Sequence, residues 1–119
     1  MHKRTFIAAA LALAGSAALA QAWPDKPVTL VVPFPPGGTT DVLARALAER
    51  LQPLLGQPVI VESKPGAGAT LGAEHVAKSR PDGHTLLVGA VHHTIASSVY
   101  KRLGYDFQKD FAPLTVIAM

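Results

Sequence analysis

The sequence contains no cysteine and few charged or aromatic side chains: 16% of its 119 residues are charged and 6% are aromatic. The absence of cysteine excludes a disulfide scaffold, a cysteine-ligated zinc site and a thiol nucleophile. Nucleic-acid-binding domains usually carry a dense basic stripe, which so few charges do not provide. A chain of this length allows one domain at most.

The net charge of +3 is concentrated at the amino terminus. Lys3 and Arg4 precede an apolar run over residues 6–20, and small residues at positions 20 and 22 follow it. A basic start, an apolar stretch and a small-x-small site predict a secretory signal peptide over residues 1–22. The run is shorter than the ~20 apolar residues that a membrane span needs.

Removal of that segment leaves nine basic and eight acidic residues, and hence a net charge of +1. We therefore expect a nearly neutral, soluble mature protein outside the cytoplasm, with no nucleic-acid partner and no direct membrane insertion. Because no cysteine stands at the cleavage site, lipidation there is excluded.

Strand-like and helix-like segments alternate along the mature chain. Short runs rich in β-branched and aliphatic residues predict strands at 28–32, 59–61, 85–88 and 114–118. Apolar spacings of three and four predict helices at 39–55, with Pro53 kinking or ending it before Gly56, at 70–78 and at 94–103. This order predicts an α/β fold, a parallel sheet with helices on both faces. The last predicted strand ends with the chain, which predicts the front part of a longer protein.

Two glycine-rich loops each lead from a strand end into a helix start, where free N–H groups and the helix dipole suit an anion. Ligands of open parallel sheets bind beyond the carboxyl ends of the strands. We predict that the loops hold a carboxylate; the alternative is that their glycines only form tight turns. The candidate residues are Phe34, Pro36, Gly37, Gly38, Thr39, Thr40 and Asp41 in the first loop, and Gly66, Ala67, Gly68, Ala69 and Thr70 in the second.

Other chemistries lack a suitable pattern of residues. No Gly-Lys-Ser/Thr follows either loop, which excludes a nucleotide P-loop. The glycine spacing over residues 66–72 resembles that of dinucleotide-binding loops, so a nucleotide-dependent reductase is kept as an alternative. His92 and His93 either face the pocket as donors or are ordinary loop residues, and their adjacency disfavours a shared metal ion. Asp41 is typical of a helix cap. With no catalytic constellation, we expect neither an enzyme nor a cofactor.

Longer motifs carry a family resemblance. They are, in order, residues 23–27 directly after the signal peptide, 31–41, 55–62, 64–68, 81–87, 105–106 and 110–113. In this order and spacing the mature chain resembles the extracytoplasmic solute receptors of tripartite tricarboxylate transporters, also called Bug receptors.

That resemblance implies a periplasmic-binding-protein-like (type II) fold of two α/β lobes, of which residues 23–119 are an incomplete first lobe. It implies a small carboxylate ligand held by the two loops, with Ala90 and His92 lining the cleft, and delivery to the membrane permease subunits of the transporter. Family members are much longer, so the second lobe is expected to be missing, and a truncated, non-functional fragment is the alternative. Ala69 stands where the family commonly has glycine.

Overall fold

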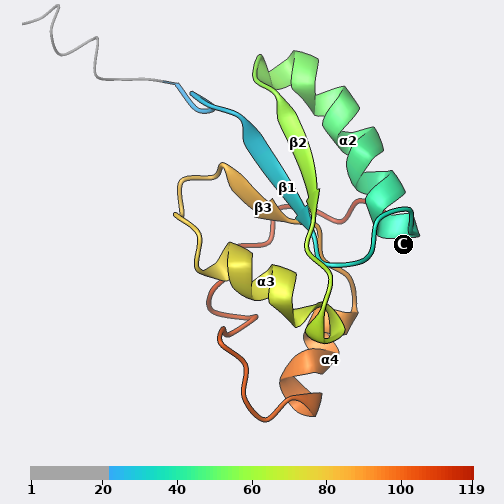
Figure 1. The fold of residues 1–119 in the computed structure, drawn as a ribbon. Coiled ribbons are helices and arrows are strands. Elements are labelled where there is room, and N and C mark those ends of the chain that lie inside the picture. The colour runs from blue at the N-terminus through green and yellow to red at the C-terminus, as the bar shows by residue number, and fades with distance from the viewer. Residues whose placement is uncertain (1–21) are drawn as a thin grey trace, which may run out of the picture.

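A three-stranded parallel sheet with three α-helices makes up residues 22–119, the part of the chain that the computed structural model describes (Figure 1). The predicted signal peptide lies outside these residues except for its last one, Ala22. No helix among the described residues is long and apolar enough to cross a membrane. The elements are β1 (Val28–Val32), α2 (Thr39–Leu55), β2 (Val59–Ser63), the short 3-10 helix η1 (Ala67–Ala69), α3 (Thr70–Ala77), β3 (Thr85–Leu87) and α4 (His92–Val99).

The strand order is β2-β1-β3, so β1 is the central strand. Val28 pairs with Val59 of β2 on one side, and Thr29 pairs with Thr85 of β3 on the other. The chain therefore moves from β1 to β2 and then crosses back over β1 to reach β3. This reversal brings the loops that follow β1 and β3 next to each other, at the point where open α/β sheets bind ligands.

Alternate residues of β1 build the core against α2. Val28, Leu30 and Val32 form a buried cluster with Ala44 and Ala48 of that helix. Val31 is fully buried but lies outside this cluster, because successive side chains of a strand point to opposite faces. The strand predicted at 28–32 is therefore present with those bounds, and it is buried on both faces.

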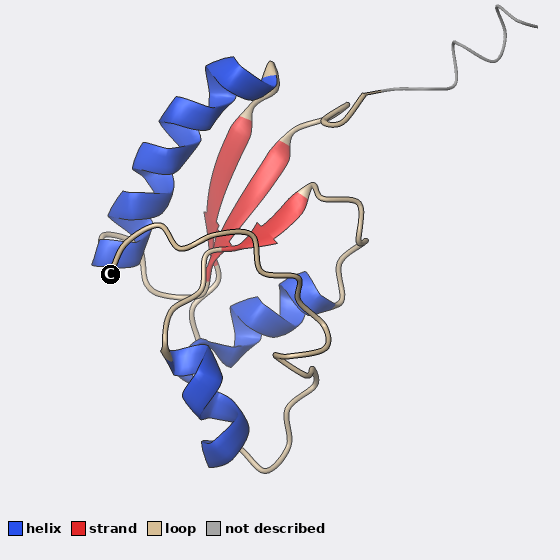
Figure 2. Ribbon diagram, turned by 180° about the vertical axis from the view of Figure 1, so that it is seen from behind, coloured by secondary structure: helices blue, strands red, loops and turns tan. Residues whose placement is uncertain are grey.

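Helices α3 and α4 lie near the end of the sheet toward which the strands run, whereas α2 runs alongside the strands (Figure 2). Helix α3 contacts β1 and β3, and α4 contacts α3 and η1. The carboxyl ends of the strands are therefore surrounded by helix starts and loops.

Helix α2 has its predicted bounds and closes at Gly56 with φ 71°; it continues through Pro53, because a proline in the last turn removes a single hydrogen bond. The structure corrects two other predicted elements. The helix predicted at 94–103 spans His92–Val99 instead. Residues 114–118 form no strand. A run of β-branched residues favours a strand only where a neighbouring strand pairs with it, and this segment pairs with neither edge of the sheet.

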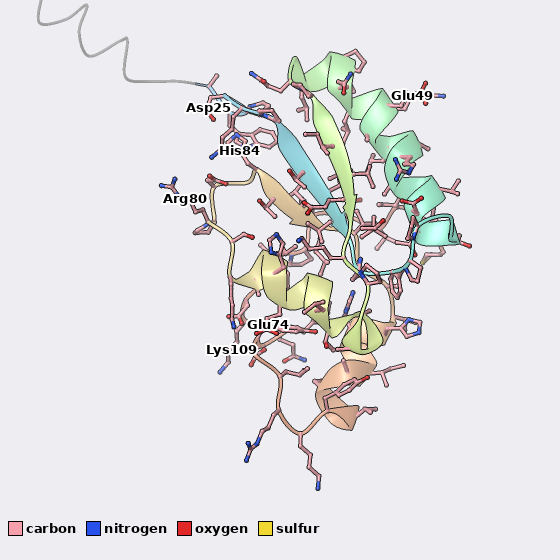
Figure 3. All side chains as sticks on the ribbon, viewed as in Figure 1. Asp25, Glu49, Glu74, Arg80, His84 and Lys109 are labelled. Carbon is pink, nitrogen blue, oxygen red and sulfur yellow. The ribbon has the colours of Figure 1, made fainter. Side chains whose placement is uncertain are left out.

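The segment that precedes β1 is attached to the turn before β3. Lys26 Nζ donates a hydrogen bond of 3.1 Å to Asp82 Oδ2, and the buried His84 places its Nε2 3.0 Å from Asp25 Oδ1. The Trp23 ring packs 6.0 Å from the His84 ring. Asp25 and His84 lie together near the amino-terminal end of β1 (Figure 3), away from the two glycine-rich loops.

Replacing Asp82 by asparagine should reduce the acid sensitivity of this attachment. The backbone N–H of His84 and the Lys26 ammonium lower the pKa of Asp82 from 3.8 to about 2. Because the pKa is depressed in the folded protein, the stabilisation is present above pH 3.8 and is lost as the pH falls toward about 2. Urea midpoints measured from pH 5 to 2 should fall less steeply in Asp82→Asn than in the wild type. Glu49→Gln, on the exposed side of α2, is the control that should follow the wild type, and an unchanged slope in Asp82→Asn would contradict the account.

Candidate functional site

A hollow of about 400 Å³ opens where the ends of β1 and β3 lie side by side. This volume is within the range of small-molecule sites. Its lining combines the first glycine-rich loop, the start of α2 and the residues that follow β3: Phe34, Pro35, Pro36, Gly38, Thr39, Thr40, Ala90 and His92.

The start of α2 provides the hydrogen-bond donors of this hollow. No side chain caps the helix at Gly38, so the first-turn N–H groups have no side-chain acceptor. The dipole of a 17-residue helix adds a partial positive charge at the same place. Gly38 has no Cβ, which lets a ligand approach the backbone, and the hydroxyl groups of Thr39 and Thr40 lie beside it. The arrangement suits an anion bound mainly by neutral donors.

Asp41 supports the first loop from below the hollow and does not line it. Its Oδ2 accepts hydrogen bonds from Gly37 N (3.0 Å) and Arg45 Nε (3.1 Å). Those two donors, the Gly37 N–H first, hold the pKa of Asp41 below its usual value. The predicted helix cap is thus corrected: the carboxylate reaches back from the first helical turn to the loop. Gly37, like Asp41, shapes the loop without lining the hollow.

The second loop lies outside this lining, because β2 is on the other side of β1 from β3. Its backbone has a left-handed run, with φ of 128° at Gly66, 49° at Ala67, 64° at Gly68 and 71° at Ala69. Thr70 closes the run by donating from Oγ1 to Ala67 O at 2.7 Å. Left-handed conformations raise the energy of alanine by roughly 1–2 kcal/mol per residue. Strained backbone of this kind is often found at binding sites.

Replacing Ala67 by glycine should stabilise the protein by about 0.5–1 kcal/mol. The substitution releases left-handed strain of roughly 1–2 kcal/mol and increases the freedom of the unfolded chain by roughly 0.4–1 kcal/mol. Ala67 is exposed, so no buried methyl group is lost. The matched control is Ala46→Gly, an exposed position within α2, where the same change should destabilise by about 1 kcal/mol. Urea denaturation measures the change in the free energy of unfolding for both variants. If both changes have the same sign, the left-handed conformation of Ala67 is contradicted.

The two adjacent histidines have different positions. Both lie in the first turn of α4 and not in a loop, which corrects the predicted start of that helix. His92 is exposed and lines the hollow, with its ring 5.6 Å from that of Phe34. His93 is fully buried. No group of three His, Cys, Asp or Glu side chains within residues 22–119 is arranged to hold a metal ion.

Pro35 lines the hollow beside Pro36, within the first loop that the resemblance assigned to the site. One contact of the second loop had no signal in the sequence. Tyr100, directly after α4, places its hydroxyl against Gly68, where a Cβ atom would lie 3.2 Å from the Tyr100 Cζ. Residues so far apart in the chain meet only through the packing of α4 on the second loop, which no local spacing predicts.

Comparison with known proteins identifies the family. Residues 43–119 match the tripartite tricarboxylate transporter family receptor (TctC). BugT of Bordetella pertussis is 42% identical over 111 residues, covering 90% of this chain and 34% of that protein. The chain spans about a third of the length of the curated relatives it matches.

Solved structures give the same result. MatC of Rhodopseudomonas palustris with bound malate is 44% identical with a TM-score of 0.69, covering 76% of this chain and 31% of that one. The periplasmic binding protein BugD is 47% identical with a TM-score of 0.64, covering 71% and 28%. The predicted periplasmic-binding-protein-like α/β fold, in incomplete form, is thereby confirmed. These relatives are solute-binding receptors and not enzymes, which overturns the reductase alternative. The chain belongs to the tripartite tricarboxylate transporter receptor family.

Proposed function

We propose that this chain is the front part of the first lobe of a periplasmic receptor, which binds a small carboxylate in the hollow between β1 and β3. Residues 1–22 direct its secretion, and the loaded receptor delivers the ligand to membrane permease subunits of a tripartite tricarboxylate-type transporter. The observation that carries the proposal is the uncapped start of α2, which opens into the hollow at Gly38 and Thr39.

The chemistry of the hollow supports a carboxylate over other anions. Neutral N–H and hydroxyl donors at the helix start match the charge and size of one carboxylate group. The described residues that line the hollow include no lysine or arginine, and Arg45 of α2 is already engaged by Asp41, so a more highly charged phosphate group would lack a basic partner in the lining. The related MatC holds malate, a compound with two carboxylate groups.

A thermal-shift screen of the full-length protein tests this function. The ligand panel contains mono-, di- and tricarboxylates, amino acids, aromatic acids and neutral sugars of similar size. A ligand at 100 times its Kd stabilises the folded state by about 2.7 kcal/mol, so a bound carboxylate should raise the Tm clearly. Stabilisation by a sugar with none by any carboxylate would overturn the proposal.

A further inference from the structure

A fully buried histidine packs behind the hollow. The His93 side chain has no solvent exposure and lies between two aromatic rings, that of Phe34 at 6.2 Å and that of Phe107 at 5.5 Å. A Cβ atom at Gly89 would lie 3.0 Å from His93 Cδ2, so the ring packs closely against the Gly89 backbone. The His93 ring therefore packs against three segments: the first loop, the segment after β3 and the segment that follows α4.

The ring nitrogens of His93 are unusual for a buried polar group. Neither Nδ1 nor Nε2 has a hydrogen-bond partner in the part of the chain that is described. Most buried polar groups have one, and an unpaired group in an apolar site is unfavourable. The segments packed against His93 present the uncharged residues Phe34, Gly89 and Phe107, and His92 is the titratable neighbour. Burial, followed by the repulsion of His92, lowers the pKa of His93.

Phe34 connects this cluster to the binding site. Its ring lines the hollow and is held between His92 and His93. Within residues 22–119, no counter-ion or acceptor lies beside the His93 ring, so a protonated ring is stabilised by moving toward water. Because Phe34 packs on it, that movement shifts the wall of the hollow.

We propose that His93 is a positioning residue for ligand binding: its neutral ring fixes Phe34 in the wall of the hollow, and its protonation releases that wall. The inference rests on the proposed function, because it names a residue that shapes the same site. The stabilising effect of the neutral ring is present above the ordinary histidine pKa of 6.5 and is lost as the pH falls below it.

The first test is the pH dependence of malate binding to the full-length protein, measured by calorimetry from pH 7.5 to 5.0. Wild-type affinity should fall about fivefold more than that of His93→Phe, which keeps an aromatic ring without a titrating group. The ionisation of malate itself is common to both proteins and cancels in this comparison. His75→Gln, an exposed position on α3, is the control that should follow the wild type. If the close contact at Gly89 prevents His93→Phe from folding, His93→Gln takes its place.

The second test needs no ligand. With 4-fluorophenylalanine at position 34, the fluorine resonance of the wild type should shift as the pH falls from 7.5 to 5.0, and this shift should be clearly smaller when His93 is replaced. Parallel pH profiles of wild type and variant, in either measurement, would overturn the inference. If malate does not bind but the pH-dependent shift of the fluorine resonance is lost when His93 is replaced, the positioning of Phe34 stands and malate is excluded as the ligand.

Discussion

Replacing Gly72 by alanine is expected to lower the free energy of unfolding of the full-length protein by about 2–3 kcal/mol. A Cβ atom at this position of α3 would lie 2.8 Å from Pro33 Cβ and 2.9 Å from both Pro33 Cα and Lys64 O. Two of these are backbone atoms, at the exits of β1 and β2, so relief of the overlap requires α3 to move off the sheet. The higher helix propensity of alanine offsets only about 1 kcal/mol of that loss.

Gly56→Ala is the matched control for Gly72→Ala. Gly56 ends α2 with φ 71°, and a Cβ atom there would meet nothing within 4 Å. This substitution therefore introduces backbone strain without overlap and should destabilise by about 1 kcal/mol. Urea denaturation of both variants separates the two effects. If Gly72→Ala lowers the free energy of unfolding by no more than Gly56→Ala does, the close packing of α3 against the ends of β1 and β2 is contradicted.

Replacing Gly38 by alanine should weaken carboxylate binding at least tenfold while leaving the fold intact. Gly38 has φ −79°, a conformation open to any residue, and its Cβ would have only Pro35 O nearby, at 3.7 Å. The added methyl group lies in the lining of the hollow and keeps a carboxylate away from the first-turn N–H groups. Alanine stabilises the protein by stiffening the unfolded chain and destabilises it because it is a poorer helix cap than glycine. The two effects on the free energy of unfolding cancel to within about 1 kcal/mol.

The Gly56 variant again provides the comparison, because it lies at the opposite end of α2. Gly56→Ala should lose stability and keep the wild-type Kd, whereas Gly38→Ala should keep stability and lose affinity. Calorimetric titration and urea denaturation of the same two samples measure both properties. If Gly38→Ala binds the carboxylate as tightly as the wild type, the start of α2 is not part of the binding site.

The sequence predicted well those elements whose formation depends on the residues within them. The β-branched run of β1 and the apolar spacing of α2 gave both elements at nearly their observed bounds. The left-handed end of α2 followed from Gly56, because a single residue type favours that conformation. The glycines at 37, 38, 66 and 68 likewise marked both loops.

Properties that depend on distant partners were not predictable in this way. The order β2-β1-β3 decides that residues after β3 line the hollow and that the second loop does not, and no periodicity encodes that order. The aliphatic run at 114–118 has strand propensity but no partner strand. The burial of His93 depends on Phe107, which lies outside the α4 helix and was not connected with the site by any spacing.

Calorimetric titration of the full-length protein with malate and with malamide, its uncharged diamide, tests the central claim most directly. The two compounds share size and carbon skeleton but differ in the carboxylate groups that the start of α2 should recognise. The account predicts saturable one-to-one binding of the carboxylate, with the diamide at least a hundredfold weaker. Equal affinities, or binding of the diamide alone, would show that the hollow does not recognise a carboxylate.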